Sequence, residues 1–383
     1  MKDRIYLSSP HMCGDELKFI QEAFDTNWIA PLGPNVKNFE KEVREYVNAR
    51  ASLALSNGTS AIHLALKCLD VKENDIVFCQ SLTFSGTCNP IIYQGAIPVF
   101  IDSDYETWNM SPMALEKAFE DAVKTEKMPK AVIVVNLYGQ SANYDVILNI
   151  CNKYNVPVIE DAAESLGASY KGRKTGTLGE IGIYSFNGNK IITTSSGGMM
   201  VSNNEKYIKK SLFWATQAKD DARYYLHSEL GYNYRMSNVL AGIGRGQLKV
   251  LDERVNKKTY IYNTYKNAFK DIDGIEMMPV YETPNHWLSV ITLKEELGIK
   301  PIDIIDALEH ENIESRHIWN PMHKQPFFKK YKFFSSLEDG SVAEDLFNRG
   351  VCLPSDTKMS DDDLIRVINI VKKVITQKIL LSV

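Results

Sequence analysis

The chain alternates short hydrophobic runs with longer stretches in which hydrophobic residues recur at helical spacing. The short runs are rich in β-branched residues, which is typical of buried strands. They lie at residues 51–55, 76–79, 97–101, 131–135 and 156–159. The helical patterns between them cover residues 59–69, 113–127 and 144–154. Strands and helices in this order predict a mainly parallel sheet covered by helices on both faces.

The pattern continues and then changes along the second half of the chain. Residues 181–186 and 198–202 predict two more strands of the same sheet, on either side of a loop. A long helix is expected at 255–269, followed by a segment around 287–293 and a final helix at 361–376. We therefore expect a large α/β domain over residues 1–250 and a smaller α+β domain over residues 251–383.

Composition narrows the function classes. With 383 residues and 44% hydrophobic content, the chain has enough apolar material for two cores. Its 44 basic and 48 acidic side chains give a net charge of −4, with no long basic run, which argues against a nucleic-acid partner. The six cysteines contain no C-x-x-C pair, so we expect free thiols in a reducing cytoplasm and no metal site. No hydrophobic stretch approaches the roughly 20 residues of a membrane span, and the N-terminus has no targeting signal.

Lys190 and Asp161 are the strongest candidates for chemistry. Asp161 follows a hydrophobic strand, and Lys190 lies in the Gly- and Ser-rich loop between two predicted strands. A lysine amine can form a Schiff base with a cofactor aldehyde, and a buried carboxylate can keep a pyridine nitrogen protonated. The pair therefore predicts a pyridoxal phosphate site. Asp161 and Glu164 also fit a helix capping box, an alternative that spacing alone leaves open.

Further residues near strand ends could complete this site. Asn57-Gly-Thr-Ser60 follows the first strand and opens a helix, so its amides and the Thr59 and Ser60 hydroxyls could bind a phosphate. The alternative is that Thr59 or Ser60 only caps the helix. Phe84 could stack on a cofactor ring or pack in the core, and Ser185 could donate to the same phosphate.

A series of segments then resembles the DegT/DnrJ/EryC1/StrS family of sugar aminotransferases, which aminate keto-sugar nucleotides with pyridoxal phosphate. The likeness spans nearly the whole chain. It rests on the segments 57–61, 160–163, 185–190, 231–237, 316–323 and 353–355. The resemblance implies an aspartate-aminotransferase-type structure, known as fold type I.

The same resemblance assigns roles to individual residues. It makes Lys190 the Schiff-base lysine, Asp161 the partner of the pyridine nitrogen, and Phe84 the residue that stacks on the ring. It makes three hydroxyl residues ligands of the cofactor phosphate, namely Thr59, Ser60 and Ser185. It also makes Asn233 a phosphate ligand from a second subunit, which implies a homodimer with shared active sites.

The sequence departs from the family pattern in two places, one after Asp161 and one after Lys190. Glu164 stands where many members have glutamine, and residues 193–198 lack a carboxylate seen in relatives. Glu164 would place a negative charge near the cofactor ring, where it could hold a substrate group or only cap Asp161. Family members that dehydrate sugars carry histidine at the lysine position, so Lys190 implies amination.

Residues 25–35, 185–190 and 285–289 together resemble the branch that makes 4-amino-4,6-dideoxy-N-acetylglucosamine from UDP-4-keto-6-deoxy-N-acetylglucosamine, on the bacillosamine route. L-glutamate would be the amino donor. Candidate sugar-nucleotide contacts are Trp28, His317, Trp319 and His323. For the histidines, a structural hydrogen-bonding role is the alternative. Amination of a GDP-linked sugar, as in perosamine formation, or of a dTDP-linked sugar, and a regulatory protein that only binds the cofactor, also stay open.

Overall fold

An eight-stranded sheet forms the centre of the computed structural model, which describes residues 3–382. Its strand order is β1-β9-β8-β5-β4-β2-β3-β13, and all neighbours are parallel except at β9, which is antiparallel to β1 and β8. The strands are β1 (Ala51–Leu55), β2 (Ile76–Gln80), β3 (Ile97–Ile101), β4 (Pro129–Val135), β5 (Val158–Asp161), β8 (Ile181–Ser185), β9 (Gly198–Ser202) and β13 (Phe333–Phe334).

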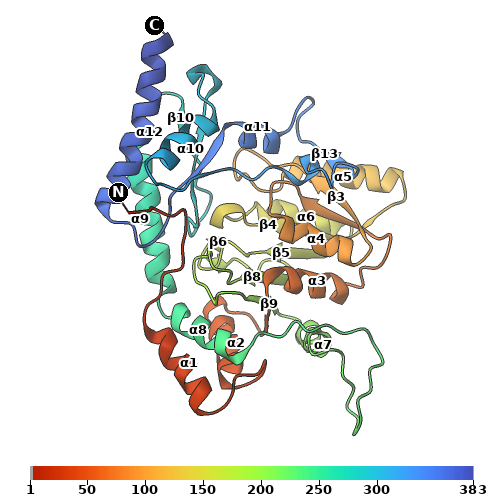
Figure 1. The fold of residues 1–383 in the computed structure, drawn as a ribbon. Coiled ribbons are helices and arrows are strands. Elements are labelled where there is room, and N and C mark those ends of the chain that lie inside the picture. The colour runs from red at the N-terminus through yellow and green to blue at the C-terminus, as the bar shows by residue number, and fades with distance from the viewer. Residues whose placement is uncertain (1–2, 383) are drawn as a thin grey trace.

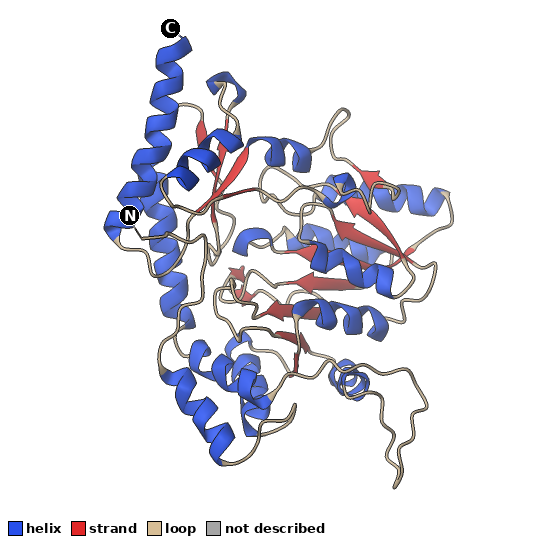
Figure 2. Cartoon of the chain, viewed as in Figure 1, coloured by secondary structure: helices blue, strands red, loops and turns tan. Residues whose placement is uncertain are grey.

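Helices cover both faces of this sheet (Figure 2). One face packs against α3 (Gly58–Cys68), α4 (Ser85–Tyr93) and α7 (Glu205–Ala215). The other side packs against α2 (Pro34–Val47), α5 (Pro112–Lys124), α6 (Tyr144–Lys153) and α8 (Asn238–Leu248), with α1 (Asp15–Asp25) lying against α8.

Strand β4 shows why the predicted strands are continuously hydrophobic. Ala131 and Ile133 belong to the core on one face, and Val132 and Val134 to the core on the other. Successive side chains of a strand point to opposite faces, and here both faces are buried, so no position is left for a polar residue.

The smaller C-terminal unit follows the long helix α9 (Leu251–Phe269), which lies beside the final helix α12 (Asp361–Ser382) (Figure 1). Its antiparallel sheet has the order β10-β11-β14-β12. The elements are β10 (Ile275–Met277), β11 (Ser289–Leu293), α10 (Pro301–His310), β12 (Arg316–His317), α11 (Val342–Arg349) and β14 (Gly350–Leu353). A small hairpin, β6 (Ser169–Tyr170) with β7 (Arg173–Lys174), and 3-10 turns at Leu137–Gly139, Glu295–Leu297 and Met322–Lys324 complete the elements.

Two segments connect these units beyond the boundary proposed near residue 250. Ile5, from the N-terminus, forms a bridge with Ile313 and joins the C-terminal core. Strand β13 pairs with β3 at the edge of the large sheet. An N-terminal residue therefore belongs to the C-terminal core, and a strand from the C-terminal part belongs to the large sheet. The domain boundary near residue 250 stays a proposal.

The expected fold class is confirmed, with small shifts in element bounds. Strand β5 begins at Val158 instead of residue 156, since Pro157 has no N–H for the ladder. The six cysteines, all within the described residues, are free thiols. Across residues 3–382 no helix is both long enough and apolar enough to pass through a membrane.

Candidate active site

A cavity of about 550 Å³ opens at the carboxyl ends of the central strands, where ligands bind in open parallel sheets. Residues of the large sheet and of the small C-terminal sheet both line it. It brings together most of the residues proposed from the sequence, namely Thr59, Phe84, Asp161, Glu164, Ser185, Lys190 and Trp319. Ser60, Asn233, Trp28, His317 and His323 are not among the lining residues.

Asp161 is the last residue of β5, and its side chain is buried. The Thr87 hydroxyl donates to one carboxylate oxygen at 2.7 Å, and the Ala163 N–H donates to the other at 3.1 Å. Burial raises the pKa of Asp161, opposed by these hydrogen bonds and by Lys190. No helix follows β5, so the capping-box alternative is wrong.

This environment fits a protonated pyridine nitrogen. Within the described chain no lysine, arginine or histidine forms an ion pair with Asp161, and its carboxylate lines the cavity. A buried carboxylate is costly unless a cation faces it. A pyridinium in the cavity would be such a cation, which is the chemistry that pyridoxal phosphate requires.

Lys190 lies in the loop between β8 and β9 and is the lysine that lines the cavity. Its Nζ atom is 3.5 Å from Oε1 of Glu164 and 4.1 Å from the centroid of the Trp287 ring. The other Glu164 oxygen accepts a hydrogen bond of 2.7 Å from the Tyr138 N–H. Burial raises the pKa of Glu164 to about 7, against the opposing charge of Lys190. Glu164 therefore faces the lysine instead of capping Asp161.

The first turn of α3 forms the floor beside Lys190. Asn57 is the cap of this helix, since its side-chain oxygen accepts the Ser60 N–H at 2.7 Å, so the alternative in which Thr59 or Ser60 caps it is wrong. Thr59 and Ser185 line the cavity. Gly58 lies beside Ser185, since an added Cβ would be in ordinary contact with that side chain at 3.4 Å. The helix N-terminus and two hydroxyls fit a phosphate. The Ser60 hydroxyl is turned to Ser56, 3.2 Å away.

Aromatic rings form a wall of the cavity. Phe84 is 61% exposed, so its core-packing alternative is wrong. Its ring lies 5.7 Å from that of Trp319, which in turn contacts Tyr138 at 5.4 Å and Trp287 at 6.3 Å. A flat ligand could therefore stack on Phe84 beside this cluster.

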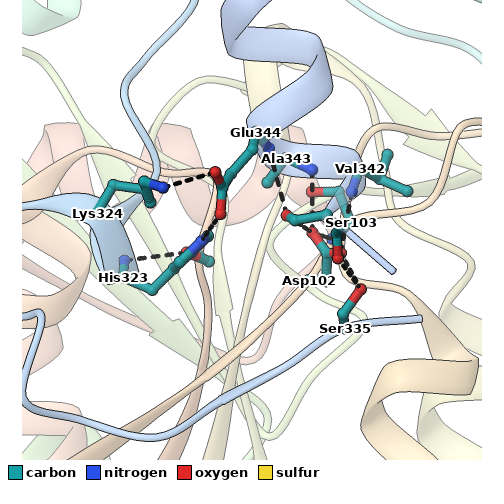
Figure 3. Close-up of polar contacts among 11 residues, drawn as sticks. Asp102, Ser103, His323, Lys324, Ser335, Val342, Ala343 and Glu344 are labelled. Atoms are coloured by element: carbon teal, nitrogen blue, oxygen red, sulfur yellow. Dashed lines mark hydrogen bonds and ion pairs between the residues drawn. The ribbon is translucent and has the colours of Figure 1, made fainter. Parts of the chain in front are cut away.

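The two predicted histidine contacts lie outside the cavity. His323 places Nδ1 2.7 Å from the Ser81 hydroxyl and Nε2 2.9 Å from Glu344 (Figure 3). Burial lowers the pKa of His323, and the neutral ring satisfies both contacts by donating to the carboxylate and accepting from the serine. His317 packs its ring against Phe347 at 5.6 Å. In this chain His323 takes the structural alternative, whereas the buried Nδ1 atom of His317 has no hydrogen-bond partner among the described residues.

Trp28 and Asn233 also lie outside this chain's cavity. Trp28 is 42% exposed, and its carbonyl accepts a hydrogen bond of 2.8 Å from the Asn238 side chain. Asn233 is exposed and pairs with Thr216 at the base of the loop after α7, which projects from the body of the molecule (Figure 1).

Several lining residues had no assigned role in the sequence analysis. They include Ser8, Thr87, Trp287 and Arg316. Trp287 and Arg316 lie inside segments that resemble the family, which was the available signal. Ser8 and Thr87 carried no signal, because only the fold brings the N-terminus and α4 to the end of β5.

Comparisons with known proteins agree with this geometry. Residues 10–372 match the model of the DegT/DnrJ/EryC1/StrS aminotransferase family. EpsN of Bacillus subtilis (strain 168), whose name describes a pyridoxal phosphate-dependent aminotransferase, is 56% identical over 97% of this chain and 95% of its own length. GDP-perosamine synthase of Caulobacter vibrioides is 35% identical over 95% of this chain and 96% of its own.

The fold has close counterparts among solved structures. The crystal structure of a DegT DnrJ EryC1 StrS aminotransferase from Brucella abortus superposes with a TM-score of 0.87 at 26% identity, covering 94% of this chain and 95% of that one. The chain thus belongs to the DegT/DnrJ/EryC1/StrS aminotransferase family and is a pyridoxal phosphate-dependent aminotransferase of fold type I.

Proposed function

We propose that this enzyme transfers the amino group of L-glutamate to C4 of a nucleotide-linked 4-keto-6-deoxy sugar. The convergence of Lys190, Asp161 and the Thr59–Ser185 cradle on one cavity supports the proposal most directly. When bound, pyridoxal phosphate supplies an electron sink. Lys190 would hold its aldehyde carbon and, once released, move the proton between substrate atoms, while Asp161 would keep the pyridine nitrogen protonated.

A second groove supports a nucleotide-linked substrate. This groove, about 480 Å³ in volume, adjoins the cavity and shares Thr83, Phe84 and Trp319 with it. Its wall includes Phe327, which is 59% exposed. The groove is also lined by the side chains of Asn89 and Asn320, which have no hydrogen-bond partner among the described residues. Exposed rings beside free amides suit a nucleobase.

Arg316 could hold the diphosphate of such a substrate. It lines the cavity, and its guanidinium pairs with Glu314 at 2.8 Å while staying largely exposed. Arginine binds phosphate oxygens through two parallel hydrogen bonds. The keto sugar near Lys190, the diphosphate near Arg316 and the base in the groove would then occupy neighbouring sites.

Two nucleotide-linked sugars are candidate substrates for this site. The likeness of residues 285–289 to the bacillosamine branch favours UDP-4-keto-6-deoxy-N-acetylglucosamine, and Trp287 of that segment lines the cavity. The identity of 35% with a GDP-perosamine synthase favours a GDP-linked keto sugar as the second candidate. Trp28, of the resembling segment 25–35, does not line this cavity, so we propose that it contacts a substrate bound to a second subunit.

We expect the glutamate-loaded enzyme to prefer UDP-4-keto-6-deoxy-N-acetylglucosamine over GDP-4-keto-6-deoxymannose. The sugars differ in base and at C2, and each polar group left unpaired costs about 1–3 kcal/mol, or roughly tenfold to a hundredfold in specificity. The measurement is recovery of the visible absorbance of the lysine-bound cofactor in a single turnover with each sugar. Equal or reversed rates would replace the proposed substrate and leave the aminotransferase assignment unchanged.

We also propose a homodimer in which Asn233 of one subunit completes the site of the other. Asn233 does not line this chain's own cavity, and the loop before it exposes Tyr224 (68%), Tyr225 (82%) and Leu230 (72%). A projecting loop with exposed hydrophobic side chains is typical of a subunit contact.

Mixing two inactive variants tests the shared site. Lys190→Ala and Asn233→Ala chains, refolded together in equal amounts, should give about a quarter of wild-type activity, because half of the dimers are mixed and each mixed dimer has one intact site. Each variant refolded alone is the control. An active monomer in sedimentation, or a mixture no more active than its parents, would contradict the proposal.

A further inference from the structure

Lys258, on helix α9, is a buried lysine that the proposed chemistry does not use. Its Nζ atom donates to the carbonyls of Trp287 and Ser355, each at 2.8 Å, and to the Ser8 hydroxyl at 3.3 Å. Its side chain is 2% exposed, and no carboxylate of the described chain pairs with it. Burial lowers the pKa of Lys258 to about 7, although Asp356 opposes this. Burying an ammonium without a paired carboxylate costs free energy. The groups that bind Lys258 therefore indicate what its position contributes.

Two of its three acceptors lead to the residue before Lys190. The Ser8 hydroxyl donates to the Asn189 carbonyl at 3.0 Å, and the Trp287 indole N–H donates to the same oxygen at 2.8 Å. The Trp287 ring lies 4.1 Å from Nζ of Lys190. Lys258 therefore holds the Ser8 hydroxyl and the backbone of Trp287. The side chains of these two residues fix the Asn189 carbonyl, and the Trp287 ring also contacts the amine of Lys190.

We infer that Lys258 is a positioning residue for Lys190. By fixing Ser8 and Trp287 it holds the peptide before Lys190 and sets the aromatic face on which the free amine rests. The inference rests on the proposed Schiff-base role of Lys190.

The proposed reaction requires the amine of Lys190 to stay in position after it leaves the cofactor. Lys190 must leave the cofactor and return to it in each cycle, and a free lysine has many rotamers to lose. An ammonium on the face of a tryptophan is attracted to the ring, and Glu164 bounds it on another side. The released amine would thus stay in reach of the reacting carbon.

A purely structural role is the rival interpretation, because the Ser355 carbonyl also ties Lys258 to the loop after β14. A double-mutant cycle on the L-glutamate half-reaction separates the two. Lys258→Met and Trp287→Phe should each slow the single-turnover loss of the visible band by about tenfold. The double variant should be clearly less than about a hundredfold slower, since Lys258 acts in part through the Trp287 indole that the second change removes. A double variant about a hundredfold slower would overturn the inference.

Controls and a second readout keep the test decisive. Lys257→Met, the neighbouring lysine on α9, should leave the rate unchanged. The pH midpoint of the visible band should move by about half a unit in Lys258→Met but not in Lys257→Met, since the contacts of Lys190 change.

If Lys258→Met fails to fold, Ser8→Ala removes one link only and should slow the step about threefold by the same reasoning. An unchanged rate in Ser8→Ala would then overturn the inference.

Failure of the proposed function would give a different result from failure of the positioning role of Lys258. A Lys190→Ala protein that keeps its visible band would remove the basis of both ideas. If that band is lost while the rate effects of Lys258→Met and Trp287→Phe multiply, only the positioning role of Lys258 is wrong.

Discussion

The Lys190→Ala variant should be colourless after addition of pyridoxal phosphate and should lose at least about a thousandfold in turnover. It removes both the amine that binds the aldehyde and the group that moves the proton, and general base catalysis alone contributes roughly 10²- to 10⁴-fold. The visible spectrum and the rate with L-glutamate and a keto-sugar nucleotide measure the two effects.

The fold should survive this change. The side chain of Lys190 is 13% exposed and makes one ion pair of 3.5 Å, to Glu164, so its loss creates no large cavity. Lys171→Ala, at an exposed lysine paired with Asp145, is the matched control and should keep colour and rate. A visible band that persists in Lys190→Ala would move the Schiff-base role to a lysine outside the lining of the cavity.

The sheet could be predicted because its strands are buried on both faces. A run such as Ala131–Val135 has no polar position for this reason, and its bounds followed from the sequence almost directly. The reversed direction of β9 could not be predicted, because hydrophobic periodicity carries no information on strand direction. The loop from β8 to β9 contains no helix, so no crossover returns the chain in parallel.

The site could be predicted where its residues stand at strand ends. Asp161, Phe84 and Ser185 are each placed at the cavity by the strand that precedes them. Trp287 and Lys258 come from segments that only tertiary packing brings to the loop of Lys190. His323 was proposed as a substrate contact from the resemblance of residues 316–323 to the family. Its hydrogen bond with Ser81, 242 positions away, could not be predicted, because no local pattern shows that pairing.

Replacing Asp161 by asparagine should leave cofactor binding measurable and lower turnover by about a hundredfold or more. An amide cannot keep the pyridine nitrogen protonated, and removing one preorganised electrostatic partner at a reacting group commonly costs 10²- to 10³-fold. The local structure can accept the change. Thr87 also lies 2.7 Å from the Thr83 hydroxyl, so it can turn to accept from the new amide and donate to Thr83. Single-turnover rates with L-glutamate measure the loss.

Thermal unfolding with and without cofactor distinguishes this role from a structural one. The pKa of Asp161 is higher in the folded chain than in the unfolded chain, so above the ordinary carboxyl range the side chain lowers the stability of the cofactor-free fold. Asparagine removes that cost, and the cofactor-free variant should unfold at the same temperature as wild type or higher at pH 7. The increase in unfolding temperature on cofactor binding should shrink, because the variant binds the ring less tightly. If instead both forms lost stability equally and the rate stayed at wild type, Asp161 would serve the fold and not the reaction.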